Sequence, residues 1–228
     1  MIGGYTASYK LSEILIIFTS IFISYSPVIV RYLKRNDIIA VQRSYLSISK
    51  LLLFIIFPLF IFLYKFGYYF LSFFGNEYLN FANVLSILAV GVYFDAVKGP
   101  IGEILNMSGN EKTEMRINLV AVILNVFLIY LLTISFGLIG AALAFAVPRM
   151  LANSSKLFFV YKLLKIKTLT MNHIKILLLQ ILIFLLISLS NGTFISILSF
   201  TIFIIFYISV VYKFELLTKL DLKIIKDI

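Results

Sequence analysis

The sequence has no cysteine, no tryptophan, a single histidine and few charged residues. Without cysteine the chain can form no disulfide, no thiolate metal site and no cysteine nucleophile, and one histidine cannot build a histidine-based metal cluster. Charged residues make up 13% of the 228 residues, against about 25% in an ordinary soluble domain. The lack of cysteine and the single histidine leave few residues for metal or thiol chemistry. The low charge indicates a chain that is not surrounded by water.

What replaces the charge is apolar surface, arranged in long runs. Apolar residues make up 62% of the chain, and the mean hydropathy is +1.07. A helix needs about 20 mostly apolar residues to cross the hydrocarbon core of a bilayer. None of the runs alternates with period two, so helices rather than barrel strands are expected. The sequence predicts an all-α, polytopic transmembrane helix bundle with seven spanning helices, near residues 8–30, 46–73, 80–107, 117–135, 138–160, 174–190 and 193–212.

Basic residues outnumber acidic ones by 20 to 10, but they follow the connectors between the apolar runs. Sixteen of the 20 lie in or beside the connectors after the first, third, fifth and seventh runs. This pattern indicates membrane topology rather than a nucleic-acid-binding face, so no nucleic-acid partner is expected. By the positive-inside rule the N-terminus is predicted outside and the C-terminus in the cytoplasm. An outside N-terminus with no span before it leads us to expect that an upstream segment is missing.

Three segments carry a resemblance to a known family. They read "IGGYTASYKLSEI", "NEYLNFANVLSILAVG" and "GNEKTEMRINLVAVILNVFLIYLLTISFGLIGAALA". They resemble helices in the second half of polysaccharide flippases of the O-antigen type, which belong to the multidrug/oligosaccharidyl-lipid/polysaccharide exporter superfamily. The likeness covers about residues 2 to 165.

The resemblance implies a two-lobe fold that flips an undecaprenyl-pyrophosphate-linked oligosaccharide across the bacterial inner membrane for surface polysaccharide synthesis. Residues 1–165 would form the C-terminal lobe with five spans, and residues 166–228 would add two spans and a cytoplasmic tail. The expected partners are membrane lipid, the lipid-linked oligosaccharide, and either a missing N-terminal half or a second copy of the chain. No cofactor is expected.

Ionisable residues inside the predicted spans are the candidate site. Each costs about 2.5 to 3.5 kcal/mol at mid-membrane and persists only when it is paired or faces water. Asp95 and Lys98 are three residues apart, hence on one helix face, and Pro100 predicts a kink beside them. Arg149 follows a proline in the fifth span and has a donor fork that suits phosphate. Glu103 is expected to be an interfacial charge.

Two interpretations of this set remain open. In the functional one, Lys98 and Arg149 face a cavity and hold the pyrophosphate, while Asp95 balances their charge or carries a coupling proton. In the structural one, the three residues form a salt-bridge cluster between helices.

The sequence also bears on classes of function other than transport. An enzyme would need an acidic metal motif or a His/Asp pair in a sizeable loop, and the connectors are short and basic, so no enzymatic activity is expected. A drug or cation antiporter of the same superfamily and an inactive truncated scaffold remain alternatives.

Three other features carry structural expectations. Asn118 and Asn125 are expected to hydrogen-bond across helices, and Gly137 and Gly140 to form a packing face with the alanines four residues on. His173 is expected to be a solvated loop residue.

Overall fold

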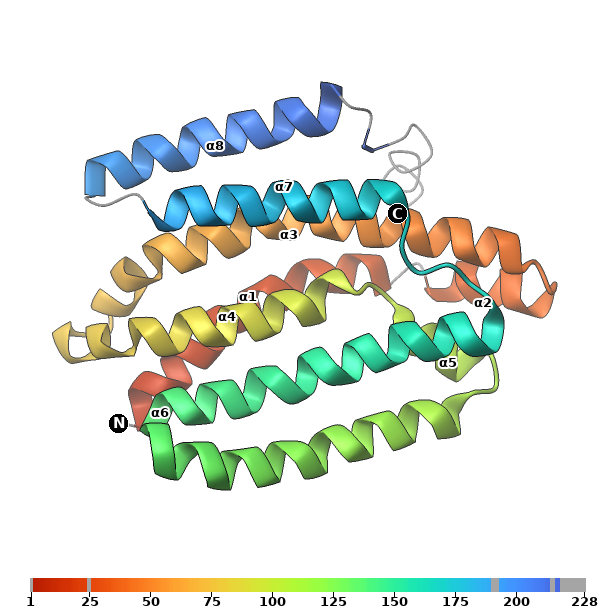
Figure 1. The fold of residues 1–228 in the computed structure, drawn as a ribbon, viewed down its shortest axis with the longest axis horizontal. Coiled ribbons are helices and arrows are strands. Elements are labelled where there is room, and N and C mark those ends of the chain that lie inside the picture. Colours follow the sequence, from red (N-terminus) through yellow and green to blue (C-terminus); the bar gives the residue numbers. More distant parts are fainter. Residues whose placement is uncertain (1, 24–25, 190–192, 214–215, 218–228) are drawn as a thin grey trace.

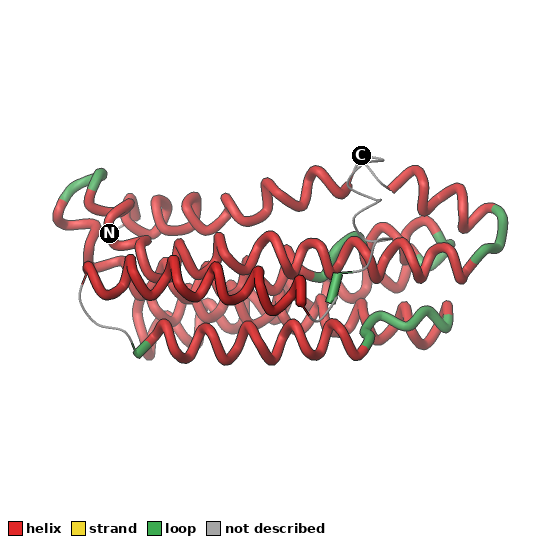
Figure 2. Tube along the Cα trace, turned by 90° about the horizontal axis from the view of Figure 1, so that it is seen from above, coloured by secondary structure: helices red, strands yellow, loops and turns green. Residues whose placement is uncertain are grey.

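The computed structural model describes residues 2–23, 26–189, 193–213 and 216–217, and all regular elements within these ranges are helical. The long helices run side by side along one axis and form an elongated antiparallel bundle (Figures 1 and 2). The elements in chain order are α1 (Ile2–Ile23), α2 (Ser26–Lys34), α3 (Ile38–Ser72), the 3-10 helix η1 (Asn76–Phe81), α4 (Ala82–Val97), α5 (Ile101–Met107), α6 (Glu111–Leu164), α7 (Met171–Ser188) and α8 (Thr193–Lys213). The predicted all-α membrane helix bundle is confirmed.

The individual spans agree less uniformly with the sequence. In the described part of the chain, four helical stretches are long and apolar enough to cross a membrane: Ile38–Ser72, Asn76–Val97, Glu111–Leu164 and Met171–Ser188. The first predicted span, 8–30, is displaced, because α1 ends at Ile23 and α2 is a separate short helix. The count of seven spans therefore stays a prediction.

Helix α3 forms the centre of the bundle and contacts α1, α2, α4, α7 and α8. Its apolar side chains are buried on most sides, with Ile48, Ile56 and Ile61 fully covered. They pack with buried residues of α5, α7 and α8 in one continuous core. A helix with apolar side chains on most faces suits this central position, where most faces meet another helix.

A buried polar network attaches the last two helices to this centre. The Gln180 side chain of α7 donates to the Leu53 carbonyl at 2.9 Å and to the Tyr207 hydroxyl at 2.8 Å, and it accepts from the Tyr93 hydroxyl at 2.6 Å. The network thus joins α3, α4, α7 and α8. Hydrogen bonds between helices in lipid contribute about 0.6 to 2 kcal/mol each, so this group fixes how α7 and α8 pack.

Helix α6 is a hairpin of two antiparallel arms joined at Gly137, whose backbone is non-helical (φ 57°, ψ −133°). The break predicted between the spans at 117–135 and 138–160 is confirmed. Gly140 is buried against the main chain at Leu132, as expected of a packing glycine, whereas a side chain at Gly137 would meet nothing within 4 Å. Gly137 is therefore a turn residue, and its expected packing role is wrong. Across the hairpin, the Asn125 amide donates to the Ala144 carbonyl at 2.8 Å, as predicted for Asn125.

The third predicted span, 80–107, is divided rather than merely kinked. η1 precedes α4, and α4 ends at Val97 before α5 begins at Ile101. Gly99 takes a positive φ of 66° between Lys98 and Pro100, a conformation that a side chain disfavours. Because Pro100 also lacks the N–H that a continuing helix would use, the chain breaks where the sequence predicted a kink.

The basic segments gather at one end of the bundle. α2, α5 and the 165–170 connector lie at this end, whereas the N-terminus and the hairpin turn of α6 lie at the other (Figure 1). The elements that meet at the basic end carry Arg31, Lys34, Arg35, Lys112, Arg116, Lys162, Lys165, Lys167 and Lys175. This grouping agrees with the sequence analysis, which placed the basic connectors on one side of the membrane. Which side this end faces stays a prediction.

Candidate functional site

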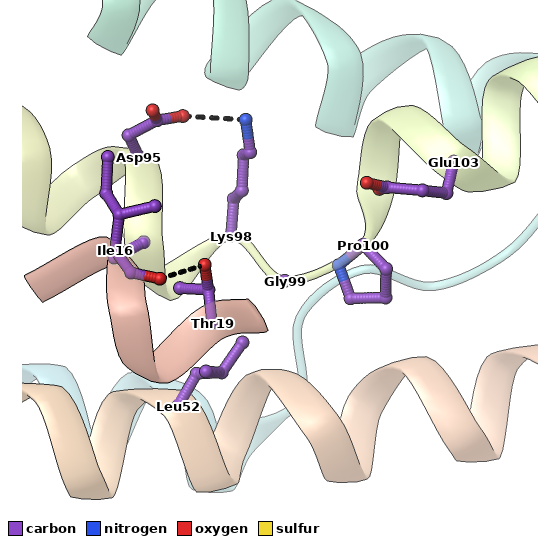
Figure 3. A pocket seen from close by; sticks show the side chains of 9 residues that line it. Ile16, Thr19, Leu52, Asp95, Lys98, Gly99, Pro100 and Glu103 are labelled. Carbon is purple, nitrogen blue, oxygen red and sulfur yellow. Dashed lines mark hydrogen bonds and ion pairs between the residues drawn. The ribbon is translucent and has the colours of Figure 1, made fainter. Parts of the chain in front are cut away.

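The helix break places Lys98 and Asp95 side by side. Lys98 follows the last turn of α4, and its Nζ lies 2.7 Å from Asp95 Oδ1 (Figure 3). The main-chain carbonyl of Lys98 accepts a 3.0 Å hydrogen bond from the buried Tyr45 hydroxyl of α3. That bond satisfies a carbonyl at the helix end and ties the break to the central helix. The pairing predicted from the three-residue spacing is confirmed.

Asn153 of α6 completes this pair from across the helix interface. Its side chain accepts from Lys98 Nζ at 2.9 Å and donates to Asp95 Oδ1 at 3.1 Å. The two helices come this close because Gly91 faces Ala146, and a Cβ at Gly91 would lie 2.7 Å from the Ala146 Cβ. Sequence reasoning missed Asn153, although it lies one helical turn after Arg149 and so shares its face.

Arg149 reaches the same carboxylate from α6. Its Nη1 lies 3.4 Å from Asp95 Oδ2, and its guanidinium lies over the Phe145 ring at 4.2 Å from the ring centre. Phe145 is held in turn by an edge contact with Tyr9 of α1, with ring centres 5.3 Å apart. The structure therefore brings together all three residues selected from the sequence, with Asp95 shared between two cations.

Two cavities meet at this cluster. One, of about 420 Å³, lies against α6 and is lined by Arg149, Asn118 and Asn125 together with Asp95 and Lys98. A smaller one, of about 160 Å³, lies between α1, α3 and the helix break, and Asp95 and Lys98 line it too (Figure 3). The Asp95–Lys98 pair thus forms part of the wall of both cavities.

Glu103 and Asn118 extend the polar lining of these cavities. Glu103 lines the smaller cavity beside Lys98 and Pro100, so it is not only an interfacial charge (Figure 3). Asn118 makes no hydrogen bond within the described part of the chain, so its expected bond across helices is not found. Both side chains leave polar groups available to a ligand.

A second ion pair lies deeper, between the two arms of α6, with α5 packed against it. Lys156 Nζ is 3.1 Å from Glu114 Oε1, and both residues are buried. A Cβ at Gly102 of α5 would lie 2.5 Å from that oxygen, so the glycine allows α5 to pack against the pair. The sixteen basic residues assigned to the connectors from the sequence included Lys156, and this placement is wrong because its ammonium is neutralised inside the bundle.

His173 also differs from its prediction. It lies in the first turn of α7 with 1% of its surface exposed rather than in a solvated loop. Its Nε2 lies 2.8 Å from Ser49 Oγ, and its Nδ1 lies 2.7 Å from Thr170 Oγ1. The imidazole thus belongs to a capping arrangement at the start of α7 and links that helix to α3.

The comparisons with known proteins decide the family. The profile of the MatE family matches residues 2–131, more than half of the chain. The chain belongs to the MatE family. This confirms the resemblance seen in the sequence at the level of the multidrug/oligosaccharidyl-lipid/polysaccharide exporter superfamily. The MatE match includes Asp95 and Lys98 and ends before Arg149 and Asn153.

The solved structure of "Lipid II flippase MurJ, inward closed conformation" has a similar fold, with a TM-score of 0.67 at 20% sequence identity. The match covers 92% of this MatE-family chain and 48% of the MurJ chain, so the chain spans about half the length of that flippase. No curated protein matches the chain. Family, fold and apolar helices together place the chain in a membrane.

Proposed function

We propose that this chain is the C-terminal lobe of a flippase for an undecaprenyl-pyrophosphate-linked oligosaccharide in the bacterial inner membrane, serving surface polysaccharide synthesis such as that of O-antigen. Lys98 and Arg149 hold the pyrophosphate, and Asp95 balances their charge. The observation that carries the proposal is that two cations share one carboxylate while all three line a cavity.

The charge count favours an anionic cargo. Lys98 and Arg149 face a single Asp95, whereas the neighbouring Lys156 is already neutralised by Glu114. Glu103 lines only the smaller cavity, and Glu13 of α1 interacts with Arg149 without forming an ion pair with it. Among the described residues, Asp95 is thus the one carboxylate that lines the larger cavity, and one positive charge at that wall has no paired carboxylate. Because an uncompensated charge in the membrane costs about 2.5 to 3.5 kcal/mol, an anionic ligand is favoured there. The same surplus disfavours the cation antiporter.

Arg149 has the geometry of a phosphate ligand. Its contact with Asp95 is long, at 3.4 Å, and about a third of its side chain, 32%, remains exposed. Stacking on Phe145 holds the guanidinium plane in place without using its N–H donors. A phosphate could thus accept two parallel hydrogen bonds from the fork, which a lysine ammonium cannot supply in that form.

The lobe needs partners on its apolar surface. The first arm of α6 packs mainly against the second, and Val122, Val126 and Ile134 are 60%, 64% and 72% exposed. We assign this face to lipid and to a second lobe, supplied by an N-terminal half or by another copy of the chain. The coverage of only 48% of the MurJ chain supports this assignment.

The test compares Lys98→Gln and Arg149→Gln with Lys162→Gln, which removes the same charge from an exposed site outside the cluster. Each variant is expressed with a matching N-terminal half in flippase-deficient cells. Surface polysaccharide and membrane-protein abundance are then measured. We expect both cluster variants to lose at least tenfold in display at normal abundance, because each removes a charged contact of about 1.5 to 3 kcal/mol.

The Lys162→Gln control should display normally. Normal display by the cluster variants, or a loss of display that follows a loss of abundance, would leave Lys98, Arg149 and Asp95 as a structural salt-bridge cluster.

A further inference from the structure

A cavity of about 560 Å³ lies at the end of the bundle opposite the basic segments. We call it the turn-end cavity. Its walls come from the start of α1, from η1 and from the hairpin turn of α6, and the N-terminus and that turn lie together in Figure 1. Its functional side chains are Glu77, Tyr78, Asn80, Phe81 and Phe136.

Two glycines of α1 set the position of the aromatic wall. A Cβ at Gly4 would overlap the Phe81 ring, and a Cβ at Gly3 would lie 3.0 Å from the Tyr78 hydroxyl. The absence of side chains there lets η1 pack directly on α1, with the Tyr78 and Phe81 rings 6.5 Å apart. These rings are therefore built into the wall of the cavity by the fold.

The lining combines apolar rings with hydrogen-bonding groups and includes no lysine or arginine. Glu77 is exposed and forms no ion pair in the described part of the chain, so its carboxylate is free to accept hydrogen bonds. The Asn80 amide can both donate and accept. Without a cation the cavity cannot compensate a phosphate. A sugar fits better, because its hydroxyls bind carboxylates and amides while its C–H face packs on an aromatic ring.

We propose that the turn-end cavity is a binding site for a neutral saccharide. Glu77 and Asn80 bind its hydroxyls, and Tyr78, Phe81 and Phe136 contact its apolar face. The same rings and carboxylate resemble an organic-cation site, but Glu77 is exposed to water, where Coulomb attraction at 4 Å is only about 1 kcal/mol. The Asn80 amide also adds nothing to a quaternary ammonium. The saccharide is therefore the occupant that uses the whole lining.

The site is placed to receive the sugar part of the proposed cargo, and this step rests on the proposed function. Val84 of α4 lines the turn-end cavity, and Asp95 of the same helix lines the cavity at the cation cluster. Leu138 and Arg149 repeat this relation on α6. At 1.5 Å per residue, the two cavities are roughly 16 Å apart along both helices. A pyrophosphate at one site and an oligosaccharide of several sugars reaching the other is compatible with that separation.

The test measures binding alone and needs no transport, so it succeeds or fails independently of Lys98 and Arg149. The chain has no tryptophan, so Ile139→Trp places a single tryptophan in the wall of the cavity, at a side chain that has no part in the proposed binding. Phe127→Trp, on the other arm of α6 and 59% exposed, is the matched reporter outside it. The purified 228-residue chain in detergent is titrated with N,N′-diacetylchitobiose, a neutral disaccharide, and separately with tetraethylammonium.

We expect the disaccharide to give a saturable change in tryptophan fluorescence with Ile139→Trp and none with Phe127→Trp. Adding Glu77→Gln should weaken that binding about tenfold, as for loss of one charge-assisted hydrogen bond. Asn80→Ala changes a second exposed side chain of the cavity and should also weaken disaccharide binding. It provides an independent test of the site if Glu77→Gln fails to fold. No saturable response to the disaccharide would overturn the proposal, and saturation by tetraethylammonium instead would reassign the cavity to organic cations.

Discussion

Asn153 determines which carboxylate oxygen of Asp95 contacts each of the two neighbouring cations. Its amide donates to Asp95 Oδ1, and its carbonyl oxygen accepts from Lys98, so Asp95, Lys98 and Asn153 form a closed triangle. The other carboxylate oxygen, Oδ2, is left for the longer contact with Arg149. Because Asn153 is only 6% exposed, water competes little for these bonds. The tight triangle therefore leaves Arg149 as the member of the cluster most available to a ligand.

The buried Glu114–Lys156 pair supports a prediction about stability. Removing one partner of a buried ion pair leaves an uncompensated charge and costs about 3 to 5 kcal/mol, whereas replacing both by apolar residues is often neutral. We expect Lys156→Met alone to lower the thermal unfolding midpoint in detergent by roughly 6 to 12 °C, taking about 3 kcal/mol for a chain of this size. The double variant Glu114→Leu with Lys156→Met should recover most of that loss.

Thermal unfolding of the single and double variants is the measurement. If the double variant were as unstable as Lys156→Met, packing of the lysine stem rather than charge pairing would explain the loss.

The candidate site was only partly predictable at the level of single residues. Asp95 and Lys98 were found because a three-residue spacing fixes a shared face whatever the rest of the fold does. Asn153 was missed because the free-energy cost of inserting one neutral amide into the membrane is too small to single the residue out as a candidate. Lys156 was misplaced because a sequence does not distinguish a lysine at the interface from one neutralised by a distant glutamate. Burial of His173 was missed for a similar reason, since its partner Ser49 lies on another helix.

At the scale of elements, the hairpin of α6 sets the register on which the site depends. Glu114 with Lys156 and Asn125 with Ala144 are both in contact, and both pairs are centred near residue 135, just before Gly137. An antiparallel hairpin pairs residues in this way once its turn is fixed. The bounds of the fourth and fifth predicted spans, 117–135 and 138–160, locate this turn from the sequence, so these pairings were within reach of prediction. Convergence of Arg149 on Asp95 was expected because mid-membrane charges need partners, but its geometry was not predictable, because it depends on how α4 crosses α6.

Gly137 offers a test of that turn. Its backbone angles, φ 57° and ψ −133°, lie in a region that residues with a side chain avoid. We expect Gly137→Ala to destabilise the chain by about 1 to 3 kcal/mol through backbone strain alone, since a Cβ there meets nothing within 4 Å. The comparison is Ser135→Ala, an exposed change in the same turn that should stay within about 0.5 kcal/mol.

Chemical or thermal unfolding in detergent measures both variants. An effect of Gly137→Ala as small as that of Ser135→Ala would mean that the turn tolerates another backbone conformation.

At the scale of the whole molecule, the two ends of the bundle carry different kinds of residue, and one wide face is apolar. The basic end carries the predicted cytoplasmic connectors, and the turn-end cavity lies at the other (Figure 1). The length of the apolar runs predicted the class of fold, because lipid permits few alternatives to helices. It did not predict the packing of α7 and α8, which depends on the single buried Gln180 and its partners on three other helices.

The exposed face of α6 leads to the last prediction, that these 228 residues do not flip the cargo alone. The chain spans about half of the MurJ structure that it resembles, with 48% of that chain covered. A cavity between two lobes needs both, and one lobe by itself would expose Lys98 and Arg149 to lipid at a cost of several kcal/mol unless another chain covered them. We expect no restoration of surface polysaccharide when a flippase-deficient strain expresses this chain by itself. Restoration should follow when a matching N-terminal half is co-expressed, and Lys162→Gln should restore display equally well in that pair. Full restoration by the chain alone, in cells that lack any such half, would instead show that copies of this chain assemble into a complete transporter.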